Sequence, residues 1–194
     1  MHLVIYGSEG SGKGTQAKLL SGKLGVPIYT SGDLVREEAI KEKGVLGDVC
    51  RKALSAGTYV ADEHMFLLWG NKLKSEEAQR GFILDGFPRT VHQAAFLFQK
   101  GEEAGYDIDK VIYLKLTDEE AVERLVKRDR KLYEGSTISH DSPERVRVRL
   151  SQFRKEEEKI ITFFRKKNML LEVNGANTRE KVFEDILTGL RVEE

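Results

Sequence analysis

The chain has 194 residues, of which 40% are hydrophobic and 33% charged, so it is long enough for one well-buried core and is not a disordered polymer. Its 32 basic and 32 acidic residues cancel, which argues against general nucleic-acid binding. The lone cysteine, Cys50, rules out an internal disulfide and a multi-cysteine zinc site, and no stretch approaches the ~20 apolar residues of a membrane span.

We therefore expect neither a nucleic acid nor a membrane among the partners. The N-terminal segment has a short apolar run without a basic leader or a cleavage site. It is typical of a buried strand and not of a signal peptide, so we expect a cytoplasmic protein.

Short apolar runs alternate with amphipathic stretches along the chain. The runs predict buried parallel strands at residues 3–6, 82–84, 111–116 and 169–173. Thr117 and Glu120 have the spacing of a capping box for a helix reaching about Arg128, and Pro143 suits the first turn of another helix. This alternation predicts one α/β domain over residues 1–194, with a parallel sheet flanked by helices.

Two segments fit this alternation poorly. Residues 31–60 have a mostly helical pattern, with Gly44, Gly47 and Gly57 as breaks, whereas residues 129–142 are polar and rich in turn formers. We expect both to be insertions at the carboxyl end of the sheet, where segments that close over a ligand are found.

The first predicted strand leads directly into a glycine-rich loop and then a helix. Glycines let the backbone turn tightly with its N–H groups pointing inward, the helix N-terminus adds positive charge, and a lysine can reach the outer phosphates. The spacing predicts a triphosphate site formed by Gly10, Ser11, Gly12, Lys13, Gly14 and Thr15. We expect Glu9 to face solvent, because an anion beside phosphates is repelled.

The loop alone does not specify a reaction, and two other readings are open at this point. A glycine-rich turn capping a helix is one, but strand, spacing, lysine and helix together disfavour it. A regulatory GTPase is the other. Its guanine-reading motif would need an aspartate, and the nearest string, Asn-Lys-Leu-Lys at residues 71–74, has none.

A second motif occupies residues 81–89. A short strand ends at Asp85, and a glycine and a Pro-Arg turn follow. An aspartate that ends a strand beside a phosphate loop is positioned to hold Mg²⁺, directly or through water. Arg89 would project into the same region, where a guanidinium can hold a phosphate with two hydrogen bonds.

Three segments resemble the adenylate kinase family: Gly-x-x-Gly-x-Gly-Lys-Gly-Thr-Gln at 7–16, Ser-Gly-Asp-Leu-Val-Arg at 31–36 and Asp-Gly-Phe-Pro-Arg-Thr at 85–90. The resemblance covers nearly the whole chain, and it explains Gly14, since this family has glycine after the lysine. It implies a P-loop NTPase-type sheet with a helical NMP-binding lobe at 31–60 and a short lid at 129–142. The implied reaction is reversible Mg²⁺-dependent phosphoryl transfer, ATP + AMP = 2 ADP.

The resemblance also implies site residues. It assigns the AMP pocket to Ser31, Arg36, Tyr59, Val60, Gly86, Arg89 and Gln93. On the donor side it implies that Arg124 stacks on the base near Asn177, and that Lys13, Arg89, Arg128 and Arg149 act on the phosphates. Ser31 and Gln93 favour AMP, because pyrimidine monophosphate kinases of similar fold tend to have alanine and asparagine there.

The lid motif departs from the family pattern. Where the family has Arg-x-Asp-Asp, this chain has Ile-Ser-His-Asp at 138–141, so Asp141 is retained and the arginine is missing. One cation at the transferring phosphates must therefore come from elsewhere or be absent, and the candidates to supply it are Arg130, Lys131, Arg145 and Arg147.

Two alternative functions are retained. One is a UMP/CMP kinase or a nucleoside monophosphate kinase of broad base specificity. The other is a nucleotide-binding switch without transfer activity, which is disfavoured because a switch does not need arginines at a second phosphate site. Since stacking tolerates any base, we also expect broad tolerance of the donor triphosphate.

Overall fold

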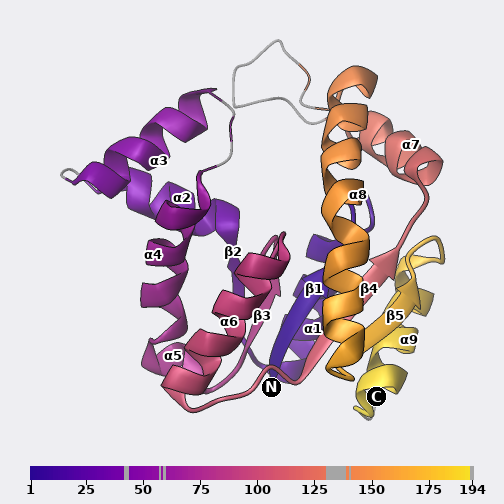
Figure 1. The fold of residues 1–194 in the computed structure, drawn as a ribbon. Coiled ribbons are helices and arrows are strands. Elements are labelled where there is room, and N and C mark those ends of the chain that lie inside the picture. Colours follow the sequence, from indigo (N-terminus) through magenta and orange to yellow (C-terminus); the bar gives the residue numbers. More distant parts are fainter. Residues whose placement is uncertain (42–43, 57, 59, 130–138, 140, 193–194) are drawn as a thin grey trace.

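The computed structural model describes residues 1–41, 44–56, 58, 60–129, 139 and 141–192. Its centre is a five-stranded parallel sheet with the strand order β2-β3-β1-β4-β5 (Figure 1). The strands are β1 (His2–Tyr6), β2 (Ile28–Thr30), β3 (Phe82–Asp85), β4 (Lys110–Lys115) and β5 (Leu170–Asn174). The prediction of an α/β fold with a parallel sheet is confirmed.

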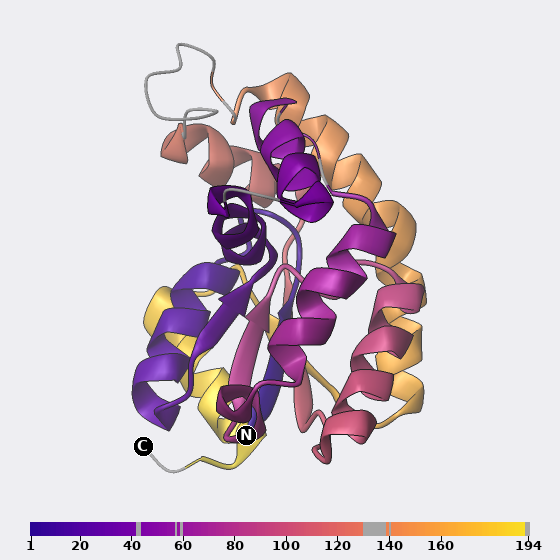
Figure 2. The same cartoon turned by 90° about the vertical axis from the view of Figure 1, so that its left-hand side faces the viewer.

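Helices cover both faces of the sheet, and the alternation of β1 shows why. Leu3 and Ile5 belong to one apolar core, with α1 (Lys13–Leu24) and α9 (Arg179–Leu190). Val4 and Tyr6 belong to the opposite core, with α4 (Asp62–Leu73), α6 (Val91–Ala104) and α8 (Pro143–Lys166). Successive side chains of a strand point to opposite faces, so β1 is buried on both sides between these layers (Figure 2).

Strand β2 is not predicted by the apolar pattern. It has three residues, and only Tyr29 is buried, so it lacks the run of apolar side chains that marks the other strands. Pairing with β3 makes it a strand, since Ile28 aligns with Ile83 and Thr30 with Asp85. The other strands differ from the expected bounds by one or two residues.

The segment after β2 is helical, as expected, and forms α2 (Ser31–Ile40) and α3 (Val45–Ala56). The expectation that Gly47 breaks a helix is wrong, because this residue lies buried within α3. A Cβ atom at Gly47 would lie 3.1 Å from the carbonyl oxygen of Glu38, so glycine lets α3 pack closely on α2 here. Gly57 lies outside the described residues.

The helices at the carboxyl ends of the strands flank the loop after β1. On one side are α2 and α3, and on the other are α7 (Asp118–Arg128) and the N-terminal part of α8 (Figure 1). The capping box of Thr117 and Glu120 and the first-turn position of Pro143 are confirmed. A one-turn helix, α5 (Glu76–Gln79), precedes β3. Within the described ranges, no helix has both the length and the apolarity to cross a bilayer.

Candidate active site

The side chain of Lys13, the first residue of α1, is hydrogen-bonded to the loop between β1 and α1. The Lys13 ammonium donates hydrogen bonds to the carbonyl oxygens of Gly7 and Ser8, both at 2.8 Å. Gly10 has a φ of 86°, and a Cβ atom there would lie 3.1 Å from the carbonyl oxygen of Ala121. Glycine therefore serves two purposes at this position: it permits the turn, and it lets α7 pack directly on the loop.

Charged groups from several segments of the chain act on the pKa of Lys13. Burial lowers the pKa of the Lys13 ammonium, the carboxylates of Asp85 and Glu9 raise it, and the guanidinium groups of Arg89 and Arg128 lower it. Burial likewise raises the pKa of the Asp85 carboxyl, against the opposing effect of Lys13 and Arg89. Elements distant in sequence, namely the loop, the end of β3 and α7, thus meet at one ionic centre.

Asp85 is suited to a divalent cation. It ends β3, and its Oδ2 lies 3.5 Å from the position that a Cβ atom would take at Gly14, so its carboxylate faces the start of α1. Among the described residues no three metal-ligating side chains cluster. A site with one carboxylate, completed by water and substrate phosphates, is the arrangement that Mg²⁺ commonly adopts, so the residues present fit this ion.

The carbonyl oxygen of Gly86 connects two segments that the sequence analysis assigns to the acceptor pocket. It accepts hydrogen bonds from the Ser31 hydroxyl at 3.0 Å and from Arg89 Nε at 2.9 Å. Arg89 is exposed, and its backbone N–H donates to Gln93 Oε1 at 2.7 Å. The structure thus brings Ser31, Gly86, Arg89 and Gln93 together.

The other residues predicted for the acceptor pocket lie on the same side of the site. Arg36 projects from α2 and is exposed, and it forms an ion pair of 2.6 Å with Asp33. Hydrogen bonds from the Thr30 hydroxyl and from Arg36 lower the pKa of the Asp33 carboxyl. Val60 is half-buried just before α4, whereas Tyr59 lies outside the described residues.

Arg124 joins the phosphate loop to the turn after β5. Its guanidinium donates to the carbonyl oxygens of Gly175 at 2.9 Å, Ala176 at 3.2 Å and Gly10 at 3.4 Å. Asn177 belongs to the same turn, where its N–H donates to Asn174. The predicted donor residues Arg124 and Asn177 therefore lie close together.

Two arginines near the phosphate loop are held by carboxylates. Arg128 makes two hydrogen bonds to Asp141, at 2.8 and 2.9 Å, and Arg149 donates to Asp141 at 3.2 Å and to Glu9 at 2.9 Å. The Asp141 side chain is fully buried, and its hydrogen bonds raise the pKa of Arg128. The series of ion pairs Arg128–Asp141–Arg149–Glu9 links the C-terminal end of α7 and the N-terminal part of α8 to the phosphate loop.

The expectation that Glu9 faces solvent is wrong. Its side chain is about one-third exposed and forms an ion pair with Arg149. The phosphates would repel the Glu9 carboxylate if it had no positively charged partner in the loop. A guanidinium supplied by α8 neutralises it, so it does not have to turn away.

Two of the four candidates for the missing lid cation, Arg145 and Arg147, lie within the described residues. Arg145 and Arg147 are exposed on α8, and Arg147 lines a groove between α7 and α8. Arg130, Lys131 and His140 lie outside the described residues, as does most of the predicted lid at 129–142.

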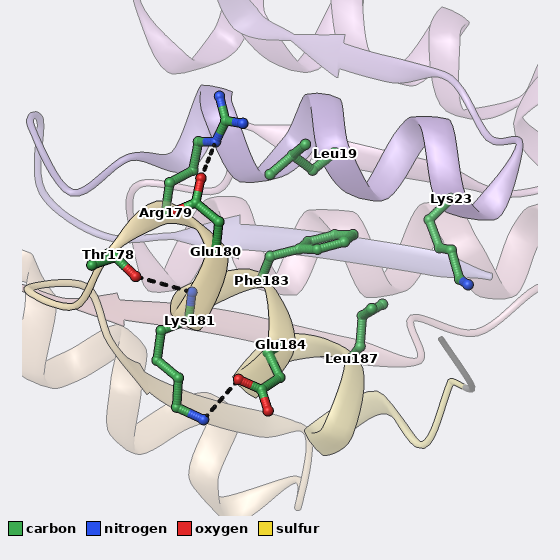
Figure 3. Close-up of a pocket in the computed structure, with 9 residues that line it drawn as sticks. All are labelled: Leu19, Lys23, Thr178, Arg179, Glu180, Lys181, Phe183, Glu184 and Leu187. Atoms are coloured by element: carbon green, nitrogen blue, oxygen red, sulfur yellow. Dashed lines mark hydrogen bonds and ion pairs between the residues drawn. The ribbon is translucent and has the colours of Figure 1, made fainter.

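A separate groove of about 640 Å³ lies between α1 and α9 (Figure 3). Its apolar floor includes Leu19 and Phe183. Two ion pairs lie at its rim, Arg179 with Glu180 at 3.2 Å and Lys181 with Glu184 at 3.0 Å. None of the predicted site residues lines this groove, so the groove is separate from the ionic centre at Lys13.

A phosphate loop with its lysine, an aspartate ending the neighbouring strand and arginines from four separate segments define a phosphotransferase of the P-loop class. The family model described as adenylate kinase matches residues 5–169. Similar proteins include adenylate kinases of Clavibacter michiganensis (36% identical, covering 97% of this chain and 92% of the relative) and Methanosarcina barkeri (31%, 98% and 99%). The adenylate kinase 1 of a Nostoc species is 34% identical, with 95% of each chain covered. This chain belongs to the adenylate kinase family and is a nucleoside monophosphate kinase.

Two side-chain interactions in this site are not predicted by the sequence. Asp62, at the start of α4, accepts a hydrogen bond of 2.6 Å from Gln93 Nε2, and Glu9 holds Arg149. These residues are 31 and 140 positions apart in the chain, and no local pattern links them. The pair of Asp33 and Arg36, by contrast, has the i,i+3 spacing that would have indicated it.

Proposed function

We propose that this chain catalyses reversible phosphoryl transfer, ATP + AMP = 2 ADP. The supporting observation is the ionic centre at Lys13. The loop lysine, the Asp85 carboxylate and the acceptor-side Arg89 act on one another there. A donor phosphate and an acceptor phosphate would therefore meet at the same point, as direct in-line transfer requires.

On the donor side, the backbone from Gly10 to Thr15 would cradle the triphosphate at the start of α1. Lys13 would exchange its carbonyl partners for phosphate oxygens, and Arg128 and Arg149 would exchange carboxylates for the charge that develops on the transferred group. Arg124, whose hydrogen bonds hold its guanidinium beside the turn that contains Asn177, would offer its planar face to the donor base.

On the acceptor side, Arg36 and Arg89 would hold the AMP phosphate. Ser31, Gly86, Val60 and Tyr59 would line the pocket, and Gln93 would read the edge of adenine. Both arginines are exposed at the same end of the sheet, where a phosphate can reach them from solvent.

The bound Mg²⁺ ion would neutralise charge on the donor phosphates. Asp85 would hold it, directly or through water. The pKa of Asp85 is raised by burial and lowered by Lys13 and Arg89, and its carboxylate faces the start of α1.

Water must be kept from the transferred group, since it competes with AMP as the acceptor. We assign this task to residues 31–60 as an NMP-binding lobe and 129–142 as a short lid, within a single domain over 1–194. The position of α2, α3 and α7 at the carboxyl end of the strands supports the assignment (Figure 1). A cytoplasmic location, with free access to nucleotides, belongs to the same proposal.

The decisive experiment is a coupled assay for ADP with ATP, AMP and Mg²⁺. We expect ADP to form at two molecules per AMP consumed, and the reverse reaction to proceed from ADP alone. ATP consumption that is independent of AMP would contradict the proposal.

The same assay tests the two alternatives. UMP, CMP and GMP replace AMP in turn, and rates equal to that with AMP would identify a kinase of broad base specificity. Nucleotide binding without transfer to any monophosphate would identify a switch.

A further inference from the structure

Both polar atoms of the Gln93 side-chain amide make hydrogen bonds within the protein. It lies in the first turn of α6 and is 6% exposed. Its Oε1 accepts the backbone N–H of Arg89 at 2.7 Å, and its Nε2 donates to Asp62 Oδ1 at 2.6 Å. One partner belongs to the turn after β3, and the other belongs to the first residue of α4.

The chemistry of these two partners allows only one orientation of the amide. A backbone N–H can only donate, and an ionised carboxylate can only accept. If the amide turned over, Nε2 would face the N–H of Arg89 and Oε1 would face the carboxylate of Asp62. Both hydrogen bonds would be lost at a buried position, and each would be replaced by repulsion. The assignment of oxygen and nitrogen therefore follows from the partners and not from atom positions alone.

A held amide can distinguish two classes of purine. One N–H of Nε2 and one lone pair of Oε1 remain after the two hydrogen bonds are made. Adenine presents an amino donor at C6 beside an acceptor at N1, whereas 6-oxopurines present an acceptor at C6 beside a donor at N1. A freely turning amide would pair with both patterns, but a fixed amide pairs with only one.

We infer that Asp62 is a specificity-determining residue that acts by positioning Gln93. It holds the amide in the orientation that accepts AMP and refuses monophosphates of 6-oxopurines, such as IMP and GMP. In the proposed complex Arg36 and Arg89 hold the phosphate, which restricts how far the base can turn to present its edge in the reverse order. This inference rests on the proposed function, since it takes the Gln93 side chain as the reader of the acceptor base.

The test compares AMP with IMP, which differ only at the edge in question, using ATP as the donor. Asp62→Asn is the main variant, because an asparagine amide can present either its oxygen or its nitrogen to Gln93, which leaves the backbone N–H of Arg89 alone to favour one orientation. Glu63→Gln is the matched control, since it removes one acidic charge at the adjacent position, where the side chain is 78% exposed. The quantity measured is the ratio of kcat/KM for AMP to kcat/KM for IMP.

We expect the wild-type ratio to exceed ~100 and the Asp62→Asn ratio to be at least ~10-fold lower, the scale on which mispaired hydrogen-bonding groups separate substrates. The control should keep the wild-type ratio within about two-fold. A merely structural role for Asp62 would lower both kcat/KM values together and leave their ratio unchanged.

Asp62→Ala is assayed in parallel, so that a folding defect in one variant leaves the test standing; its ratio should also fall. If both variants keep the wild-type ratio, the inference is overturned while the proposed function stands. If the wild-type protein forms no ADP from ATP and AMP, the proposed function fails first, whatever Asp62 does.

Discussion

The acceptor side and the phosphate side of this site are held together in different ways. On the proposed acceptor side, Ser31, Arg89 and Gln93 are fixed by directional hydrogen bonds to backbone groups and to one carboxylate. Around the phosphates, Arg128 and Arg149 are fixed by ion pairs with Asp141 and Glu9.

The difference follows from what each side has to recognise. A base edge is recognised by the order of its donors and acceptors, so its reader must not turn. A phosphate is recognised by charge, and carboxylates can hold arginines in place until phosphate oxygens replace them. The comparison predicts strict selection of the acceptor base, weak selection of the donor base and strong dependence on cations at the phosphates.

The largest effect is expected from Lys13→Ala. The substitution removes a preorganised cation from the charge that develops during transfer, so kcat should fall by at least ~100-fold. Lys18→Ala, on the exposed face of the same helix, is the matched control and should be close to wild type. Steady-state ADP formation measures both variants. A Lys13→Ala enzyme within a few-fold of wild type would refute the role of the phosphate loop.

Arg89→Ala should affect the acceptor side and leave the donor side nearly unchanged. We expect transfer to AMP to fall by roughly 100-fold in kcat/KM, because the acceptor phosphate loses its charged partner, while ATP binding changes little. Calorimetric titration with ATP and kinetics at varied AMP measure the two effects. Arg80→Ala, at another exposed arginine, is the control. An equal loss of ATP affinity would assign Arg89 to the donor site instead.

The donor base should be selected less strictly than the acceptor base. Arg124 offers a stacking surface and no order of donors and acceptors, so GTP and other triphosphates should support measurable turnover with AMP. A panel of triphosphates tests this. A preference for ATP above ~1000-fold would contradict it, since that requires about 4 kcal/mol of base-specific contact.

The smallest effect is expected from Glu9→Gln. Glu9 is paired with Arg149, so in the proposed complex the triphosphate displaces the Glu9 carboxylate from Arg149 and then lies close to this carboxylate. Removing the negative charge of Glu9 should therefore tighten ATP binding by about three- to ten-fold. Glu180→Gln, with a side chain 75% exposed on α9, is the control and should leave affinity unchanged. Calorimetry gives both dissociation constants. Weaker binding by the Glu9 variant would mean that the ion pair supports the loop.

Local sequence determined the strands β1, β3, β4 and β5, the phosphate loop, the capping box at Thr117 and the first-turn Pro143. Each of these depends on apolar periodicity or on turn and cap preferences, which operate over a few residues. Strand β2 was not predicted, because three residues with one buried side chain are too few to show an apolar periodicity. Only pairing with β3 makes these residues a strand.

The sequence by itself also determined the class of chemistry, because glycines, a lysine and a strand-ending aspartate at fixed spacings depend on local backbone geometry. Only the tertiary structure decided how the side chains are partnered. Glu9 meets Arg149, and Asp62 meets Gln93, because α8 and α4 pack beside the phosphate loop and α6. Such pairs depend on how distant elements pack, and the chemistry of a residue's neighbours along the chain does not reveal them.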